Sequence, residues 1–131
     1  MTFLIRVLKV QAAVWVVFGV ALAITPAGVL RLIDQTVPRD GAWIRLLGVC
    51  AVVLALYMVL VAQHAVQTWW WAWGFVVLEA GVATVAIINA IAGVPTGLPA
   101  WPWWTLGIVS IAFGALDLLG IVQAEHEKPV T

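Results

Sequence analysis

The sequence predicts an all-α integral membrane protein, a four-helix bundle whose transmembrane helices run up-down-up-down. Hydrophobic residues make up 65% of the 131 residues and charged residues only 9%, and the mean hydropathy is +1.13. The apolar residues gather in four runs of about 20 residues, the length that a helix needs to cross about 30 Å of hydrocarbon. Tryptophan and proline cluster at the ends of these runs, where they are best tolerated.

The four runs place the spans at about residues 4–25, 43–63, 70–92 and 103–123, within a single domain of residues 1–131. Each run is apolar on all sides and about twice as long as a membrane-spanning strand, which favours helices. Arg6 and Lys9 precede the first apolar stretch, so this segment also fits a secretory signal. Because it is long enough to span when counted from Val7, we expect it to be the first membrane helix.

The first loop, residues 26–42, is the longest and most polar connection. Within residues 29–34, Leu30 and Ile33 fall on one side of a helix and Arg31 on the other. This pattern fits either a short helix on the membrane surface or an ordinary solvated connection. A surface helix would cover the mouth of the bundle.

Tryptophans mark the start of the last three spans. Trp43 opens the second run, residues 69–73 open the third and residues 101–104 open the fourth. We interpret these rings as anchors at headgroup level. The alternative is an aromatic wall around a lipid or a quinone-like ligand.

The number of basic residues on each side does not decide the orientation in the membrane. Four crossings place both termini on one side of a cell (inner or plasma) membrane, and three basic residues fall on each side, Arg6, Lys9 and Lys128 against Arg31, Arg39 and Arg45. Basic residues flank the first helix, whereas the third loop, residues 93–100, carries no charge. We therefore expect a multi-pass protein with cytoplasmic termini.

Two acids, Glu79 and Asp117, interrupt the third and fourth apolar runs. An ionisable side chain near the middle of the bilayer costs at least about 2.5–3.5 kcal/mol, so each acid calls for a function or a polar partner. Glu79 lies roughly 12 Å inside the third span and Asp117 roughly 9 Å before the end of the fourth. Since the two helices are antiparallel, both depths are measured from the same membrane face.

Small residues share the helix faces of the two acids. They follow helical spacing of three and four, with Ala83 and Ala86 after Glu79, and Gly107, Ser110 and Gly114 before Asp117. Because small residues let membrane helices approach closely, we expect these stripes to meet and both acids to face the bundle interior.

Arg6, Lys9 and Gln11 of the first helix are the candidate partners of the acids, and with them would form an intramembrane polar cluster. Arg6 and Lys9 either extend to the headgroups or neutralise the acids in a buried network. Such a network would be a structural contact that sets the register of the helices, a proton-titrating site or the polar end of a ligand pocket. The sequence leaves these three interpretations open.

The layout resembles the DoxX-like group of small bacterial four-helix membrane proteins. The similarity comprises the four spans, the longer first loop beginning near Pro26, and the start of the second helix, Trp43-Ile44-Arg45-Leu46-Leu47-Gly48, followed by an apolar run with Tyr57. Some members of the wider group are associated with redox complexes, so the resemblance implies an accessory role without assigning a catalytic residue.

Several function classes lack support. We find no phosphate-binding glycine loop, no metal-ligand spacing and no catalytic constellation, so we predict no cofactor and favour a non-enzymatic protein. The zero formal net charge gives no basis for nucleic-acid binding. The remaining predictions are an accessory or assembly subunit, or a protein that binds a small hydrophobic ligand, with the lipid bilayer, further copies of this chain or another membrane protein as partners.

Proton-coupled transport of a small molecule is the alternative function, because acids in membrane helices mark proton and substrate paths. Small multidrug-resistance transporters also have four short helices and one membrane glutamate. Their glutamate lies in the first helix, however, and residues 4–25 of this chain contain no acid.

Overall fold

The computed structural model describes residues 1–93 and 96–126, and these are helical with connecting turns and no strand. Lys128, which entered the charge balance, and residues 94–95 of the third loop lie outside the described residues. Four segments are long and apolar enough to cross a membrane, namely Thr2–Ile24, Ala42–Gln63, Ala65–Ala92 and Trp101–His126. The predicted all-α fold class with four spanning helices is confirmed, and the chain is a multi-pass membrane protein.

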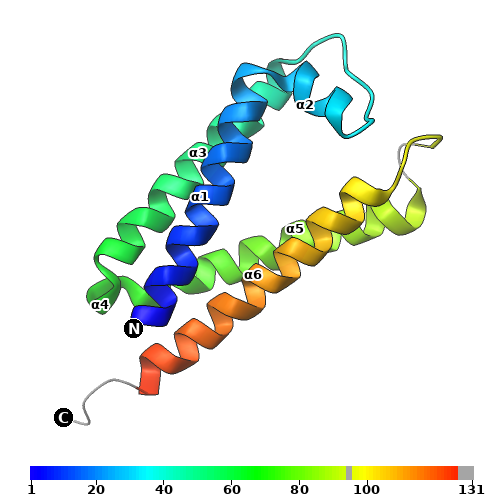
Figure 1. Ribbon diagram of the computed structural model, residues 1–131. Coiled ribbons are helices and arrows are strands. Elements are labelled where there is room, and N and C mark those ends of the chain that lie inside the picture. Colours follow the sequence, from blue (N-terminus) through cyan, green and yellow to red (C-terminus); the bar gives the residue numbers. More distant parts are fainter. Residues whose placement is uncertain (94–95, 127–131) are drawn as a thin grey trace.

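The four long helices form two hairpins. Helix α1 (Thr2–Ile24) packs along α3 (Ala42–Gln63), and α5 (Ala72–Ala92) packs along α6 (Trp101–His126), whereas contact between the hairpins is mainly that of α1 with α6. The hairpins meet near the start of α1 and the end of α6 and diverge toward the first and third loops (Figure 1). The bundle is therefore V-shaped, with a closed end and an open end.

The first loop contains a short helix, α2 (Pro26–Leu32), at the open end (Figure 1). It begins three residues earlier than the predicted surface segment and ends two residues sooner. The backbone of Thr25 leaves the helical region, with φ −129° and ψ 61°, and Pro26 starts the new helix because the first helical position needs no N–H donor. Asp34, at φ 55°, then turns the chain away from it.

The second loop is helical as well, with α4 (Ala65–Thr68) followed by the 3₁₀ helix η1 (Trp69–Trp71). The third span was predicted to start at residue 70, whereas α5 itself starts at Ala72. The Thr68 hydroxyl donates to the His64 carbonyl at 2.9 Å and tightens this turn. Tyr57 of α3 contacts Trp71 and Phe75 edge to face, with ring centroids 5.5 and 6.0 Å apart. These aromatic contacts fasten the second hairpin to α3 at the closed end.

Helix α6 is longer than predicted at both ends. It starts at Trp101 and accommodates Pro102 in its first turn, where proline is tolerated. The preceding α5 ends at Gly93, whose left-handed backbone (φ 61°) is the usual stop for a helix. Apolar side chains remain exposed along the outer faces of all four long helices, for example Val17, Leu47, Ile88 and Ile111. These faces are suited to lipid contact.

The first hairpin is built on direct backbone contact. A Cβ atom added to Gly48 of α3 would lie 2.5 Å from the carbonyl oxygen of Gly19 and 2.6 Å from the backbone nitrogen of Ala23, both in α1. Only glycine at position 48 permits this approach, and close approach is what gives membrane helices their packing energy.

Gly48→Ala is therefore expected to force α1 and α3 apart and lower the free energy of unfolding by about 1–3 kcal/mol, the usual cost of overpacking. The measurement is thermal unfolding in mild detergent. Gly74→Ala is the matched control, because a Cβ at Gly74 meets nothing within 4 Å. Equal melting temperatures for the two variants would contradict the assigned contact.

Candidate functional site

The two hairpins join through a compact core at the closed end. Leu4 and Leu8 of α1 are fully buried there together with Met58 of α3 and Ile121 of α6. Gly120 of α6 makes room for this contact, since an added Cβ would lie 2.9 Å from a methyl carbon of Leu4. Leu4, Leu8 and Gln11 share one face of α1, so the same face that packs the core also carries a polar side chain inward.

A polar cluster of Gln11, Trp15, Glu79 and Asp117 lies beside this core. The Gln11 amide nitrogen donates to Glu79 Oε1 at 2.6 Å, and the Trp15 indole nitrogen donates to the same oxygen at 3.1 Å. Glu79 is only 1% exposed. Both hydrogen bonds run from the first hairpin to the second, so the Glu79 carboxyl group ties the hairpins together.

Asp117 is the unusual member of the polar cluster. Its side chain is fully buried, and neither carboxyl oxygen has a hydrogen-bond partner. Glu79 and Gln11 lie close enough to act on it electrostatically, yet no hydrogen bond of ordinary geometry reaches it. The Gln11 carbonyl oxygen is also buried without a donor. The cluster thus holds two carboxyl groups and more hydrogen-bond acceptors than donors.

The small residues of the stripes lie in the contact between α5 and α6. A Cβ added to Gly107 would meet Ile87 at 3.2 Å and Ala86 at 3.6 Å, and one added to Gly114 would meet the Cβ of Glu79 at 3.5 Å. Ala83, Ala86 and Ser110 are buried in the same contact region. Gly114 lies one turn before Asp117, so the close approach of the two helices brings both acids into one site.

Arg6 and Lys9, named from the sequence as candidate members of the polar cluster, do not join it, and of the two placements left open their exposure fits extension toward the headgroups. Both side chains are exposed, and no ion pair links them to Glu79 or Asp117. The reason is helical geometry, because Arg6 and Lys9 lie on the side of α1 opposite to the face that carries Gln11 inward. Extension into the headgroup region also avoids the cost of burying a cation.

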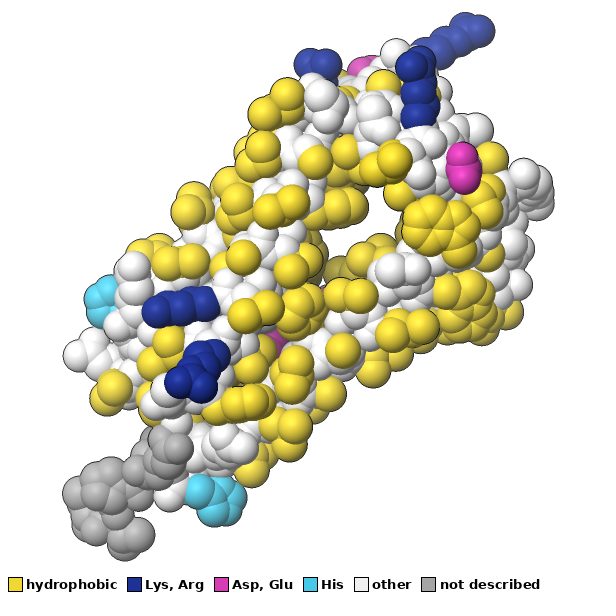
Figure 2. Space-filling view, viewed as in Figure 1, with side chains coloured by type: hydrophobic (Ala, Val, Ile, Leu, Met, Phe, Trp, Pro, Cys, Tyr) yellow, Lys and Arg dark blue, Asp and Glu magenta, His cyan; other side chains and the backbone are white. Residues whose placement is uncertain are grey.

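An opening passes between the two diverging hairpins and is walled by hydrophobic side chains (Figure 2). The joined core and polar cluster close one end of it. At the other end the Gln35 amide of the first loop donates to the Pro99 carbonyl of the third loop at 3.2 Å. Protein therefore borders the opening between the hairpins on every side.

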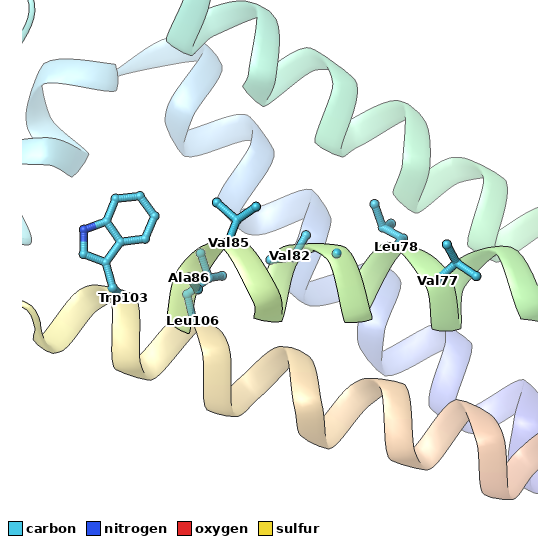
Figure 3. Close-up of a pocket in the computed structure, with 8 residues that line it drawn as sticks. Val77, Leu78, Val82, Val85, Ala86, Trp103 and Leu106 are labelled. Carbon is cyan, nitrogen blue, oxygen red and sulfur yellow. The ribbon is translucent and has the colours of Figure 1, made fainter. Parts of the chain in front are cut away.

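A groove of about 450 Å³ runs along α5 and the first turns of α6. Its lining is apolar and includes Leu78, Val82 and Gly81 of α5, with Trp103 of α6 near one end (Figure 3). Leu78 also packs against the joined core, which contains residues of α1 and α3, so the groove lies on the side of α5 that faces the first hairpin. Its volume falls within the roughly 300–1,000 Å³ of small-molecule pockets.

Comparisons with protein-family models, curated proteins and solved structures found no match to this chain. Within the described residues, no group of three or more His, Cys, Asp or Glu side chains could hold a metal ion. The features that bear on function are therefore the polar cluster, the opening and the groove.

Sequence reasoning missed three contributors to this region. Trp15 was not singled out because an indole in an apolar run is normally an interfacial or packing residue. The bond from Gln35 to Pro99 joins positions 64 residues apart and has no sequence signal. Gly81 lies outside the spacing of Ala83 and Ala86, and a Cβ added to it would meet nothing within 4 Å.

The unequal bonding of the two acids predicts unequal effects on stability. Glu79→Met would leave the buried Gln11 donor and the partly buried Trp15 donor without an acceptor, at a cost of about 1–3 kcal/mol for the buried donor and less for the other. Asp117→Asn removes an unpartnered carboxyl group and adds a donor next to the Gln11 carbonyl, so its melting temperature should equal or exceed that of the wild type. Chemical or thermal unfolding in detergent measures both variants. Greater destabilisation by Asp117→Asn than by Glu79→Met would refute the assigned bonding.

Proposed function

We propose that this membrane protein binds a small hydrophobic molecule, taken from the bilayer into the opening between its hairpins. The observation that carries the proposal is the apolar groove along α5 on the side facing the first hairpin. Its wall is almost wholly apolar, which suits a lipid-like or quinone-like molecule. The groove exists because Gly81 contributes no side chain where Val77, Val82 and Val85 surround it.

The bond between Gln35 and Pro99 favours a small ligand over a partner helix. A helix with its side chains is about 10 Å wide and would need an opening free at one end. The loops close that end here. A flexible chain or a flat ring can enter sideways from the bilayer, since the opening faces hydrocarbon along its length.

The polar cluster supports ligand binding indirectly in this proposal. Glu79, Gln11 and Asp117 are at most 1% exposed, so they do not line the groove. By tying α1 to α5 at one end, they set the angle between the hairpins and hence the width of the opening. Breaking the bonds to Glu79 is expected to weaken ligand retention by changing that width.

Filling the groove tests the proposal. Gly81→Leu adds a side chain in open space within the groove and is expected to fold normally while retaining much less of any hydrophobic molecule. The measurement is native mass spectrometry of protein purified in mild detergent, followed by solvent extraction and identification of the bound species. A defined lipid or quinone should accompany the wild type at near one copy per chain.

Gly74→Leu is the matched control, because Gly74 is also an exposed glycine of α5 with nothing within 4 Å and lies outside the groove. It should retain the molecule as the wild type does. Wild-type protein without any discrete bound species, or equal retention by the two leucine variants, would overturn the proposal.

Proton-coupled transport is the second candidate function. The observation in its favour is Asp117, a fully buried acid with two unpartnered oxygens next to a second acid. Uptake or release of a proton at this site would change the contact between the hairpins and so the width of the opening. Transport of the bound molecule would then depend on the pH difference across the membrane.

The test uses proteoliposomes loaded with a pH-sensitive dye and supplied with the molecule identified by mass spectrometry. Under proton coupling, Asp117→Asn should abolish molecule-dependent proton movement while leaving the melting temperature intact. Ligand retention without any proton movement in the wild type would exclude transport and leave the binding function standing.

An accessory role, which the DoxX-like resemblance implies, is compatible with a bound hydrophobic molecule that is passed to a larger complex. The outer apolar faces of the long helices also offer surfaces for a second copy or another membrane protein. Genome neighbours that encode redox enzymes would support this role, and neighbouring efflux regulators would favour transport.

A further inference from the structure

A second pocket, of about 240 Å³, lies at the open end of the molecule between α2 and the start of α3. Its floor is apolar and includes Pro26, Leu30 and Ile44, whereas Arg39 and Arg45 contribute positive charge at its edge. Figure 2 shows both basic and acidic side chains at this end of the molecule. An apolar floor beside two cations is a pattern suited to an amphipathic anion.

Both arginines are available to a ligand. Arg39 and Arg45 are exposed, and neither guanidinium group forms a hydrogen bond or an ion pair within residues 1–93 and 96–126. The lining of the pocket contains no acid. The nearest acid in sequence, Asp40, uses its carboxylate to accept the backbone N–H of Ala42 at 2.9 Å. The positive charge of the pocket is therefore not neutralised by the residues that form it.

The pocket lies at the level of the lipid headgroups. Trp43, 72% exposed, follows directly after the loop that forms the pocket wall. Trp101 and Trp104 are exposed at the start of α6, at the same end of the molecule. Exposed tryptophans at the ends of membrane helices mark the interface between hydrocarbon and water. A ligand in this pocket would have its charged group in the headgroup layer and its apolar part against α2.

We propose that this pocket binds an anionic phospholipid, with Arg39 and Arg45 holding its phosphate group and the glycerol and first chain carbons lying on Pro26, Leu30 and Ile44. Guanidinium groups are well matched to phosphate oxygens in geometry and charge. Free phosphate has no apolar part that could pack against the apolar floor of the pocket. A zwitterionic lipid carries a cation that two unpaired arginines repel. The volume holds a headgroup and not a whole lipid, so the acyl chains stay in the bilayer.

Native mass spectrometry with defined lipids tests the proposal. Delipidated protein in mild detergent is mixed with equal amounts of dioleoylphosphatidylglycerol and dioleoylphosphatidylcholine, and the bound fraction of each is measured. The wild type should prefer the anionic lipid. Each of Arg39→Gln and Arg45→Gln should weaken its binding by about tenfold, because a charged hydrogen bond is worth at least that factor.

Arg31→Gln is the matched control, since Arg31 is an exposed arginine of α2 outside the pocket lining. It should bind the anionic lipid as the wild type does, and all three variants should keep the wild-type melting temperature because the side chains are exposed. Equal binding of both lipids would reject the site. An equal loss of anionic-lipid binding in Arg31→Gln would also reject it, because the binding would then depend on general surface charge. Displacement of the lipid by millimolar inorganic phosphate would overturn it in favour of a free-phosphate site.

Discussion

The structure depends on one interaction inside the membrane, the acceptance of two hydrogen bonds by Glu79. In hydrocarbon, apolar side chains gain little by leaving lipid for another helix, so helix association relies on close packing and polar contacts. The donors, Gln11 and Trp15, both belong to α1, and the acceptor belongs to α5. These bonds therefore add a polar connection between two hairpins that also meet through the apolar core at the closed end. The position of the opening and the groove follows from where this joint lies.

Asp117 contributes no comparable hydrogen bond to the contact between the hairpins. A buried carboxyl group without a hydrogen-bond donor is less stable than an apolar side chain of the same size, and in a membrane helix the cost is large. Stability alone thus gives no reason for an acid at this position. Its place beside Glu79 puts a second carboxyl group directly at the contact between the hairpins.

The sequence was sufficient to predict the four spans and the inward direction of Glu79 and Asp117, because length and helical periodicity determine both. It was not sufficient to place Arg6 and Lys9, whose long side chains can reach either a buried acid or the headgroups. The sequence also did not predict the angle between the hairpins. That angle depends on where Gln11 and Trp15 meet Glu79 and on a bond between two distant loops, and no pattern in the apolar residues specifies either.

The two ends of the opening differ in a way that suggests how a molecule could enter and leave. The closed end combines a packed apolar core with one buried and one partly buried hydrogen bond, whereas the other end depends on a single exposed bond from Gln35 to Pro99. Exposed hydrogen bonds contribute little net free energy because water competes for both partners. The loop end is accordingly the weaker of the two, and widening of the opening would begin there, next to the pocket formed by Arg39 and Arg45. Lipid bound at that pocket would hold α2 and the start of α3 together and so affect how far the hairpins separate.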